Sequence, residues 1–392
     1  MREAVIVAMG RSAVGKAPKG VFKNTRPESI ASQVITGMLD KEDSEIKNQI
    51  EEVIFGCAFP EAEQGLNVAR NISLLSGITN EASAQTVNRF CASGLQAIAT
   101  GANSIKCGEN SVVLAGGIES MSVVPMGGNL SLGHPELIEK EPGAYVSMGI
   151  TAENVAKRYG ISRKEQDEFS YNSHIKALKA QQAGKFERQI IPVYADSVEV
   201  IDGKPQKVSR LITQDQGIRP TISVEALGKL RPVFKAGGSV TAGNASQMSD
   251  GSGVVLLMEK EEALEKGLKP LAKFVGFATS GVDPNYMGLG PIPAIKKVLK
   301  QTHLEVNDID LFELNEAFAS QALACIDELG LDKDKVNVNG GAIALGHPLG
   351  ATGGILTVKL LDEMLENNLK YGCVSMCIGG GMGAAAIFET IR

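Results

Sequence analysis

Tryptophan is absent from the 392 residues, and the chain has only four histidines and six cysteines. Six cysteines in so long a chain are too few for a disulfide scaffold, so we expect reduced thiols and a cytoplasmic location. No apolar run approaches the roughly 20 residues that span a bilayer, and residues 4–8 are too short for a secretory leader. Basic residues are not in excess, because 45 acidic against 39 basic residues give a net charge of −6. The absence of a long apolar run excludes a membrane-spanning protein, and the absence of a basic excess excludes a dedicated nucleic-acid binder.

The residues that are abundant describe a folded protein, with 43% hydrophobic and 21% charged residues. Short apolar runs bounded by glycine or charge predict buried strands at residues 4–8, 53–55, 112–115, 254–258, 272–278, 374–378 and 384–388. Apolar stripes with helical spacing predict helices over residues 93–105 and 353–365. Alternation of strands and helices predicts the α/β class, in two or three domains.

The two ends of the chain resemble each other. The segment VNRFCASG (87–94) precedes a helix and a strand ending in AGG, and NGGAIALGHPLGATG (339–353) precedes a helix and a strand ending in IGGG. EEVIFGCAF (51–59) also echoes DIDLFELNEAF (308–318). We interpret these echoes as two copies of one α/β unit, although any two α/β segments share some of this pattern.

The middle of the chain, residues 120–248, is more polar. Ser162 and Glu165 form a capping-box pattern that predicts the start of a helix, which Gly184 could end. From Lys204 to Lys235, seven basic and two acidic residues give a local net charge of 7 − 2 = +5. This stretch is either a solvated face or an anion site, for example for the phosphates of a nucleotide-bearing substrate.

Cys91 lies where a predicted strand at residues 85–88 ends and a predicted helix begins. Backbone N–H groups and the helix dipole stabilise negative charge there, and such positions lower a thiol pKa. Small neighbours would let a substrate carbonyl approach the backbone. Cys91 is therefore a candidate nucleophile, and a buried structural cysteine is the alternative.

Cys377 ends a predicted strand and precedes a run of glycines at 379–381. Cys373 is about 13 Å away along an extended strand, beyond disulfide reach. No second Cys/His pair has the spacing of zinc ligands, so we expect no metal site. The glycine run precedes a strand instead of a helix, which argues against a dinucleotide site. It favours a loop where substrate lies against backbone N–H groups, with a simple tight turn as the alternative.

Of the four histidines, His174 and His303 are expected to be solvated, and His134 lies in a charged loop without a predicted role. His347 lies in an apolar, glycine-rich setting where a neutral imidazole could take a proton from a thiol. Asn315 follows a predicted strand, so it is either a helix N-cap or an amide that orients a water or an oxyanion. Cys91, Cys377, His347 and Asn315 all fall at strand-to-loop or loop-to-helix ends, and ligands gather at the carboxyl ends of strands in α/β sheets.

At these residues the chain resembles the thiolase family. The resemblance is carried by VNRFCASG (87–94), AGGIESMS (115–122), MGITAENVA (148–156), VTAGNASQMSDG (240–251), LNEAFA (314–319), NGGAIALGHPLGATG (339–353) and CIGGGMG (377–383). It implies a thiolase fold, with two similar βαβαβαββ halves in a five-layered α-β-α-β-α core and an inserted loop domain. The implied boundaries are residues 1–119 plus 249–269 for the N-terminal half, 120–248 for the CoA-binding loop domain, and 270–392 for the C-terminal half.

The resemblance also implies roles. Cys91 would carry the acyl group as a thioester, His347 would take its proton, and Cys377 would be the second acid/base. Asn315 would hold a water in one oxyanion hole, and the backbone N–H groups of Cys91 and Gly379 would form another. Substrate and CoA contacts are expected from Arg219, Ser246, Met148 and Phe318, with Arg219 near the nucleotide phosphates. No permanently bound cofactor is implied, because coenzyme A and acyl-CoA are substrates.

Two departures bear on the substrate. Acetoacetyl-CoA thiolases commonly have a His where this chain has Ser147, and they have a longer segment between Glu119 and Met148 that helps them form tetramers. Both differences favour a degradative 3-ketoacyl-CoA thiolase of fatty-acid β-oxidation and a homodimer, with a dimer of dimers as the alternative. The alternatives are an acetyl-CoA acetyltransferase, a non-catalytic acyl-CoA-binding protein on the same fold, and a condensing ketoacyl synthase, against which Cys377 argues.

Overall fold

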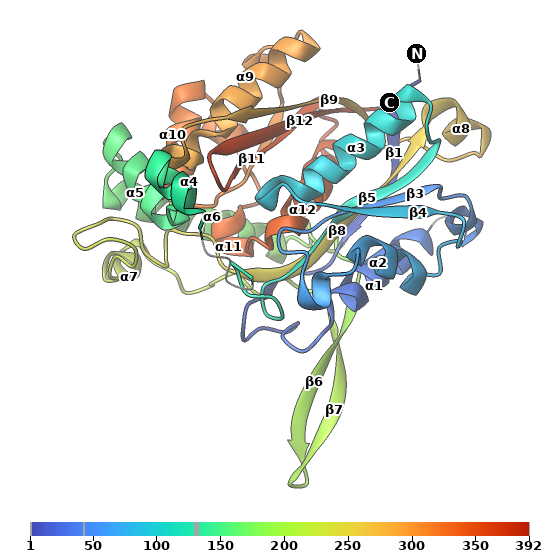
Figure 1. The fold of residues 1–392 in the computed structure, drawn as a ribbon, viewed down its shortest axis with the longest axis horizontal. Coiled ribbons are helices and arrows are strands. Elements are labelled where there is room, and N and C mark those ends of the chain that lie inside the picture. The colour runs from blue at the N-terminus through green and yellow to red at the C-terminus, as the bar shows by residue number, and fades with distance from the viewer. Residues whose placement is uncertain (1, 42–43, 129–132, 392) are drawn as a thin grey trace.

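The computed structural model describes residues 2–41, 44–128 and 133–391. Within these residues a ten-stranded mixed sheet has the order β10-β11-β12-β9-β1-β8-β5-β3-β4, with the short β2 paired to β8 (Figure 1). Its strands are β1 (Ala4–Arg11), β2 (Gly15–Lys16), β3 (Glu52–Gly56), β4 (Ser83–Val87), β5 (Val112–Ser120), β8 (Ser249–Glu259), β9 (Ala272–Gly281), β10 (Leu311–Leu314), β11 (Tyr371–Ile378) and β12 (Met382–Thr390).

The strand order repeats itself on the two sides of the β1–β9 contact. On one side β5 lies between antiparallel β8 and parallel β3. On the other side β11 lies between antiparallel β12 and parallel β10. The two halves therefore share one local topology, as the internal echoes predict, and every strand predicted from an apolar run lies inside one of these strands.

The apolar faces of the strands define five layers. In the first half, Leu114 packs toward α1 (Pro27–Leu39) and α2 (Val68–Leu75), whereas its neighbour Val113 packs toward α3 (Ser93–Cys107). Helix α12 (Thr352–Glu366) joins α3 between the two halves of the sheet. Helices α9 (Pro291–Thr302) and α10 (Ala319–Leu329) cover the far face of the second half. These layers match the five-layered α-β-α-β-α core that the resemblance implies.

Two glycines let the central helices touch at their first turns. A Cβ atom on Gly353 would clash with the backbone of Leu95, and one on Gly94 would lie 2.8 Å from the carbonyl oxygen of Gly350. Contacts this short leave no room for any side chain. The close approach brings the loop before α3 against the loop before α12, although the two lie more than 250 residues apart in the sequence.

Residues between β5 and β8 form a lobe of helices and one hairpin. Its elements are α4 (Pro135–Lys140), α5 (Met148–Tyr159), α6 (Arg163–Gln182), β6 (Val193–Ile201), β7 (Lys204–Ile212) and α7 (Val224–Gly228). Helix α6 begins at the predicted capping box, in which Ser162 and Glu165 bond reciprocally. Two short helices elsewhere, α8 (Lys260–Glu265) and α11 (Ala342–Leu345), complete the set in the described residues.

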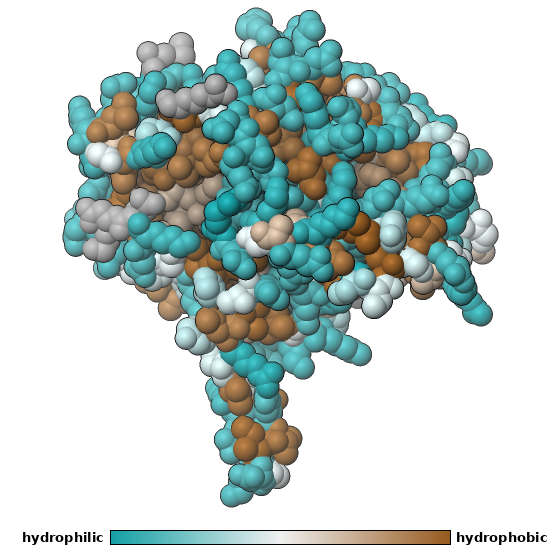
Figure 2. Space-filling view, turned by 180° about the vertical axis from the view of Figure 1, so that it is seen from behind, coloured by the Kyte–Doolittle hydropathy of each residue, from teal (hydrophilic) through white to brown (hydrophobic). Residues whose placement is uncertain are grey.

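The β6–β7 hairpin projects from the body of the molecule (Figures 1 and 2). It carries only part of the basic stretch from Lys204 to Lys235. Lys204, Lys207 and Arg210 lie on the hairpin, where Arg210 pairs with Glu199, whereas Arg219 lies beyond it. The basic side chains of this stretch are exposed, as the solvated-face alternative expects, and they are divided between the hairpin and the segment beyond it. Apolar side chains are exposed near the hairpin tip, among them Val198 and Val200. No helix in the described residues is both long and apolar enough for a bilayer crossing.

Candidate active site

Cys91 lies in a short 3₁₀ turn, Phe90–Ala92, between β4 and α3. The side chain is buried, with 3% of its surface exposed. Burial raises the pKa of the Cys91 thiol to about 12, although the backbone N–H groups of Gly379 and Cys91 point toward the sulfur and lower the pKa. The expectation that the helix N-terminus would lower this pKa was therefore wrong, because loss of water outweighs the two N–H groups.

The Gly379 N–H comes from the opposite half of the molecule. Gly379 follows β11 and begins the turn to β12, in which Gly380 and Gly381 have φ angles of 82° and 83°. The glycine run is therefore both a tight turn and a loop that presents backbone N–H to Cys91, so the two interpretations of the sequence are compatible. The first half supplies the sulfur, and the second half supplies an N–H group next to it.

Cys377 lies two residues before Gly379 and is fully buried. Burial raises the pKa of Cys377 well above its usual range, and negative charge on nearby Cys91 raises it further. Both thiols are therefore protonated at neutral pH. Cys377 packs among Ala245, Phe318 and Met148, whereas Cys91 packs in a different cluster.

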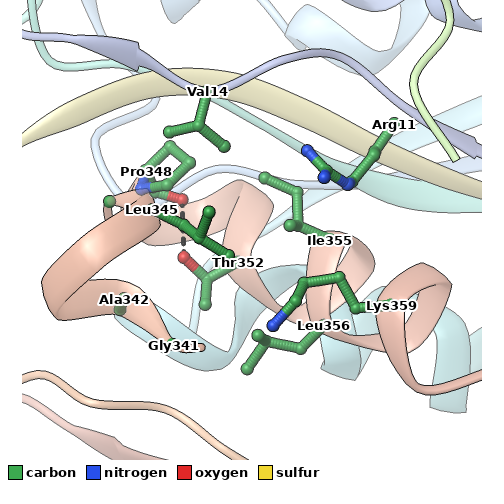
Figure 3. Close-up of a pocket in the computed structure, with 11 residues that line it drawn as sticks. Arg11, Val14, Gly341, Ala342, Leu345, Pro348, Thr352, Ile355, Leu356 and Lys359 are labelled. Carbon is green, nitrogen blue, oxygen red and sulfur yellow. Dashed lines mark hydrogen bonds between the residues drawn. The ribbon is translucent and has the colours of Figure 1, made fainter. Parts of the chain in front are cut away.

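His347 lies between α11 and a 3₁₀ turn, Leu349–Ala351, and it is 4% exposed. Its Nε2 atom is 3.3 Å from Nδ2 of Asn315, and its Nδ1 atom is 2.6 Å from Oγ1 of Thr352. An amide Nδ2 only donates, so Nε2 accepts and the ring proton is on Nδ1. Thr352 in turn donates to the carbonyl oxygen of Pro348 at 3.0 Å, which leaves its oxygen free to accept from Nδ1 (Figure 3).

Burial lowers the pKa of His347 to about 4, so the imidazole is neutral at pH 7. With its proton on Nδ1, the lone pair of Nε2 faces Asn315. Behind the His347 loop, a cavity of about 10 Å³ lined by Val14, Leu345 and Ile355 has room for at most about one water (Figure 3). This rear side has no space for a substrate.

Asn315 follows the last residue of β10, and its backbone N–H donates to the carbonyl oxygen of Ser375 in β11. The N-cap interpretation of Asn315 was wrong, because α10 begins at Ala319 with Phe318 in the cap position. The Oδ1 atom of Asn315 is buried and has no hydrogen-bonding partner within the described residues. An unpartnered buried oxygen of this kind is costly unless it serves a ligand or a water.

The residues predicted to bind substrate lie in two places. Met148, at the start of α5, and Phe318 pack with Cys377, and Ser246 donates its backbone N–H to Ala317 in the same wall. Arg219 is exposed, and its backbone N–H donates to Nδ1 of His174.

His174 is 2% exposed, so the expectation that it is solvated was wrong. Burial, followed by the charges of Arg219 and Lys16, lowers the pKa of His174 to about 4. Burial and the positive charge of Arg219 also disfavour the charged form of Lys16 and lower its pKa. His174 therefore supports the backbone of the segment that carries Arg219.

Sequence reasoning missed Glu119, which lies at the end of β5. Its buried carboxylate accepts from the backbone N–H groups of Ala58 and Gly350, at 2.7 and 2.8 Å, and from Gln64. Burial raises its pKa, and these donors lower it. Glu119 thus ties together the two loops that flank Cys91. The only sequence signal was an acidic residue inside the apolar strand segment AGGIES.

Thr352 and Glu316 were missed as well. Glu316, next to Asn315, accepts from Ser173, from Asn337 and from the backbone N–H of Ile343, and so anchors the segment before His347. Within the described residues, no cluster of three His, Cys, Asp or Glu side chains could hold a metal ion. The six cysteines are free thiols.

The chain is similar in sequence and structure to known proteins. The family models described as "Thiolase, N-terminal domain" and "Thiolase, C-terminal domain" match residues 4–261 and 268–390. The chain is 52% identical over 390 residues to the 3-ketoacyl-CoA thiolase of Bacillus subtilis, covering 99% of this chain and 100% of that protein. It is 46% identical to 3-ketoacyl-CoA thiolase A, peroxisomal, of Mus musculus, covering 99% and 91%. The crystal structure of the Bacillus anthracis acetyl-CoA acetyltransferase is similar with a TM-score of 0.90 and 40% identity, covering 100% of this chain and 99% of that chain.

Proposed function

Because this chain belongs to the thiolase family, we propose that it cleaves 3-ketoacyl-CoA with coenzyme A, giving acetyl-CoA and a shortened acyl-CoA in fatty-acid β-oxidation. The observation that carries the proposal is the meeting of the Cys91 sulfur with the Gly379 N–H, two residues after Cys377. Two thiols and a neutral imidazole suit an acyl transfer that also makes or breaks a carbon–carbon bond. Full-length identity to relatives with this name supports the substrate class.

In the first half-reaction, Nε2 of His347 takes the proton of the Cys91 thiol, and the sulfur attacks the keto carbon. The backbone N–H groups of Cys91 and Gly379 donate hydrogen bonds to the resulting oxyanion. When the carbon–carbon bond breaks, its electron pair forms the acetyl-CoA enolate, whose oxygen is held by protonated His347 and a water on Asn315. The Cys377 thiol then protonates the enolate carbon. Each oxyanion donor is worth about 3–4 kcal/mol in related sites.

The second half-reaction returns the enzyme to its starting state. The Cys377 thiolate takes the proton of the incoming coenzyme A, whose sulfur attacks the thioester on Cys91. The acyl group leaves as acyl-CoA, and Cys91 recovers its proton from His347. Coenzyme A is a substrate in this scheme, and no permanently bound cofactor is required. Met148, Phe318 and Ser246 would contact the pantetheine arm, and Arg219 the nucleotide phosphates.

The test compares thiolysis of 3-ketohexadecanoyl-CoA with that of acetoacetyl-CoA. We expect activity on both, and activity on the four-carbon substrate alone would favour an acetyl-CoA acetyltransferase, the name of the similar solved structure. Intact mass after mixing with 3-ketoacyl-CoA should show one acyl adduct, absent in Cys91→Ser. No adduct on the wild-type chain would indicate a non-catalytic acyl-CoA-binding protein.

Cys377→Ala separates the roles of the two thiols. With acetyl-CoA the leaving group is the coenzyme A thiolate, which departs without a proton far more easily than a carbanion does, so we expect the variant to acylate at Cys91 and to lose overall turnover. The His347→Ala variant is the matched comparison, because it should lose acylation as well. If Cys377→Ala also fails to acylate while remaining folded by circular dichroism, the division of labour between the thiols is wrong.

We also propose a homodimer, with a dimer of dimers as the larger alternative. Strand β4 lies at the end of the sheet order, so one of its edges has no strand partner among the described residues. Nearby, Leu66 is 94% exposed, and Leu74 and Leu75 of α2 are also exposed. An open edge beside apolar side chains is typical of an interface. Light scattering should give about twice the 41.3 kDa chain mass.

Residues 120–248 are proposed as the CoA-binding loop domain, because Met148, Arg219 and Ser246 all lie within them. The boundaries 1–119 with 249–269, and 270–392, remain our proposal for the two halves. A cytoplasmic location is proposed from the free cysteines, which an oxidising compartment would tend to pair.

A further inference from the structure

Two apolar walls meet at the two thiols, and only one of them has a role so far. The first wall surrounds Cys377 and includes Met148 and Phe318, to which the proposed function assigns the CoA arm. The second wall surrounds Cys91 and consists of Ala58, Met121 and Leu349, with Phe59 packed against it. A Cβ atom on Gly379 would lie 3.8 Å from both Met148 and Phe90, so the walls adjoin at this glycine.

We propose that the second wall binds the fatty acyl chain of the substrate and that Phe59 and Phe90 determine chain-length preference. This inference rests on the proposed function. The bond that breaks joins the keto carbon, held by Cys91, to the acetyl unit, protonated by Cys377. The CoA arm therefore extends on the Cys377 side. The remaining substituent of the keto carbon, which is the acyl chain, must leave on the Cys91 side.

The ring of Phe90 is held at the edge of this wall. It lies 6.3 Å from the ring of Phe59, at an interplanar angle of 49°, and Phe90 is 39% exposed. The backbone of Phe90 has φ = +43°, fixed by a bond from its N–H to Asn88 and by a bond from Ser93 to its carbonyl oxygen. A bulky residue rarely adopts this conformation, and more than a third of Phe90 stays exposed beside the candidate site. A binding contact explains both features.

The floor of the wall is rigid and polar. Glu119 accepts from the backbone N–H groups of Ala58 and Phe59 and so fixes both residues. A hydrocarbon chain cannot enter past this buried carboxylate without stripping its hydrogen bonds. The chain is therefore directed along the Phe59–Phe90 pair toward the surface, where the exposed ring of Phe90 leaves its far end unenclosed. Long chains are accommodated in this arrangement.

The experiment compares two exposed aromatic residues on opposite sides of the site. Phe234 pairs with Phe318 at 6.0 Å on the CoA side and is 38% exposed, which matches Phe90 closely. We measure kcat/KM for 3-ketohexadecanoyl-CoA and acetoacetyl-CoA in Phe90→Ala, Phe59→Ala and Phe234→Ala. In the first two variants the ratio of long-chain to four-carbon efficiency should fall about tenfold, as for lost contact with roughly two methylene groups.

Phe234→Ala should change the efficiency with both substrates by the same factor and leave their ratio unchanged, because the CoA arm is common to both. An unchanged ratio in both Phe59→Ala and Phe90→Ala, or a shifted ratio in Phe234→Ala alone, would overturn the assignment. Phe59→Ala covers the case in which Phe90→Ala disturbs the neighbouring Cys91. Failure of the proposed function would look different, because the wild-type chain would then cleave neither substrate or acetoacetyl-CoA alone.

Discussion

Cys91, the proposed nucleophile, is buried in a way that works against its own ionisation. With a pKa of about 12, the resting thiol is neutral, so the site depends on a base that acts when substrate is bound. His347 suits that task, because burial lowers its pKa to about 4 and keeps the ring neutral. The same desolvation thus raises one pKa and lowers the other, and both groups stay uncharged until reaction.

Thr352 fixes which nitrogen of His347 can act as that base. In Thr352→Val the Nδ1 proton loses its acceptor in a buried site, at a cost of about 1–3 kcal/mol, and the ring can adopt the other tautomer. We expect kcat to fall roughly 5- to 150-fold with little change in KM. Thr352→Ser keeps the hydroxyl and should restore kcat. Equal kcat in the valine variant and the wild type would exclude this positioning role.

At the scale of elements, the contact between α3 and α12 sets the distance between the loops of Cys91 and His347. Gly353→Ala places a methyl group against Leu95, whose Cβ and Cα atoms would lie 2.7 and 2.8 Å from it. Overpacking of this kind costs about 1–3 kcal/mol, so denaturation should show a lower free energy of unfolding. Acylation of Cys91 should slow in the same variant, because the helices must separate.

Gly228 provides the matched control for Gly353. It lies in helix α7, and a Cβ atom there would meet nothing within 4 Å. Gly228→Ala should leave stability unchanged or raise it by about 0.4–1 kcal/mol, with normal acylation. A Gly353→Ala variant as stable as Gly228→Ala would show that the contact between the two helices can relax freely.

Elements differ in how well their environment could be predicted from sequence. Cys91, His347 and Cys377 stand in glycine-rich motifs that end strands or precede helices, and these local patterns were sufficient to single them out as candidates. The pKa of Cys91 was mispredicted because the residues that bury it, Ala58, Met121 and Leu349, are distant in sequence.

Helix α6 shows the same limit in another form. Its buried residues include Gln166, Asp167, Ser170, Ser173 and His174, so no apolar stripe marks the buried face. Polar partners satisfy this face instead, as where Ser173 donates to Glu316. A hydrophobic pattern predicts burial only where apolar contacts provide it, so His174 was assigned to solvent.

For the whole molecule, the repeated halves were predictable because each carries its own copy of strand, loop and helix signals. The projection of the β6–β7 hairpin was not, because its alternating residues specify strand pairing and give no direction relative to the body. The sequence therefore could not show that Lys204, Lys207 and Arg210 lie on the hairpin while Arg219 lies beyond it. The direction in which a hairpin projects depends on the contacts at its base. The local sequence pattern does not encode those contacts.

The two buried histidines make the stability of the whole molecule depend on pH. The pKa values of His174 and His347 are both lowered to about 4, so between pH 6.5 and 4 the unfolded chain binds protons that the folded chain does not. Each histidine therefore contributes nothing above about pH 7 and destabilises the fold as pH falls, by about 2 kcal/mol at pH 5. Buried carboxyls with raised pKa values, such as Glu119 and Glu316, stabilise the fold as pH falls and so oppose the histidines. The contribution of a histidine must therefore be measured by replacing that histidine alone.

His174→Asn isolates it, because an amide oxygen can accept from the Arg219 N–H as Nδ1 does, without titrating. We expect the variant to lose about 2 kcal/mol less stability than the wild type between pH 7.5 and pH 5, measured by urea denaturation at each pH. His303→Asn is the control, since that side chain is exposed and should leave the difference unchanged. Parallel pH profiles for His174→Asn and the wild type would mean that His174 binds its proton as readily in the folded chain as in the unfolded chain. Its burial would then not make the free energy of unfolding depend on pH.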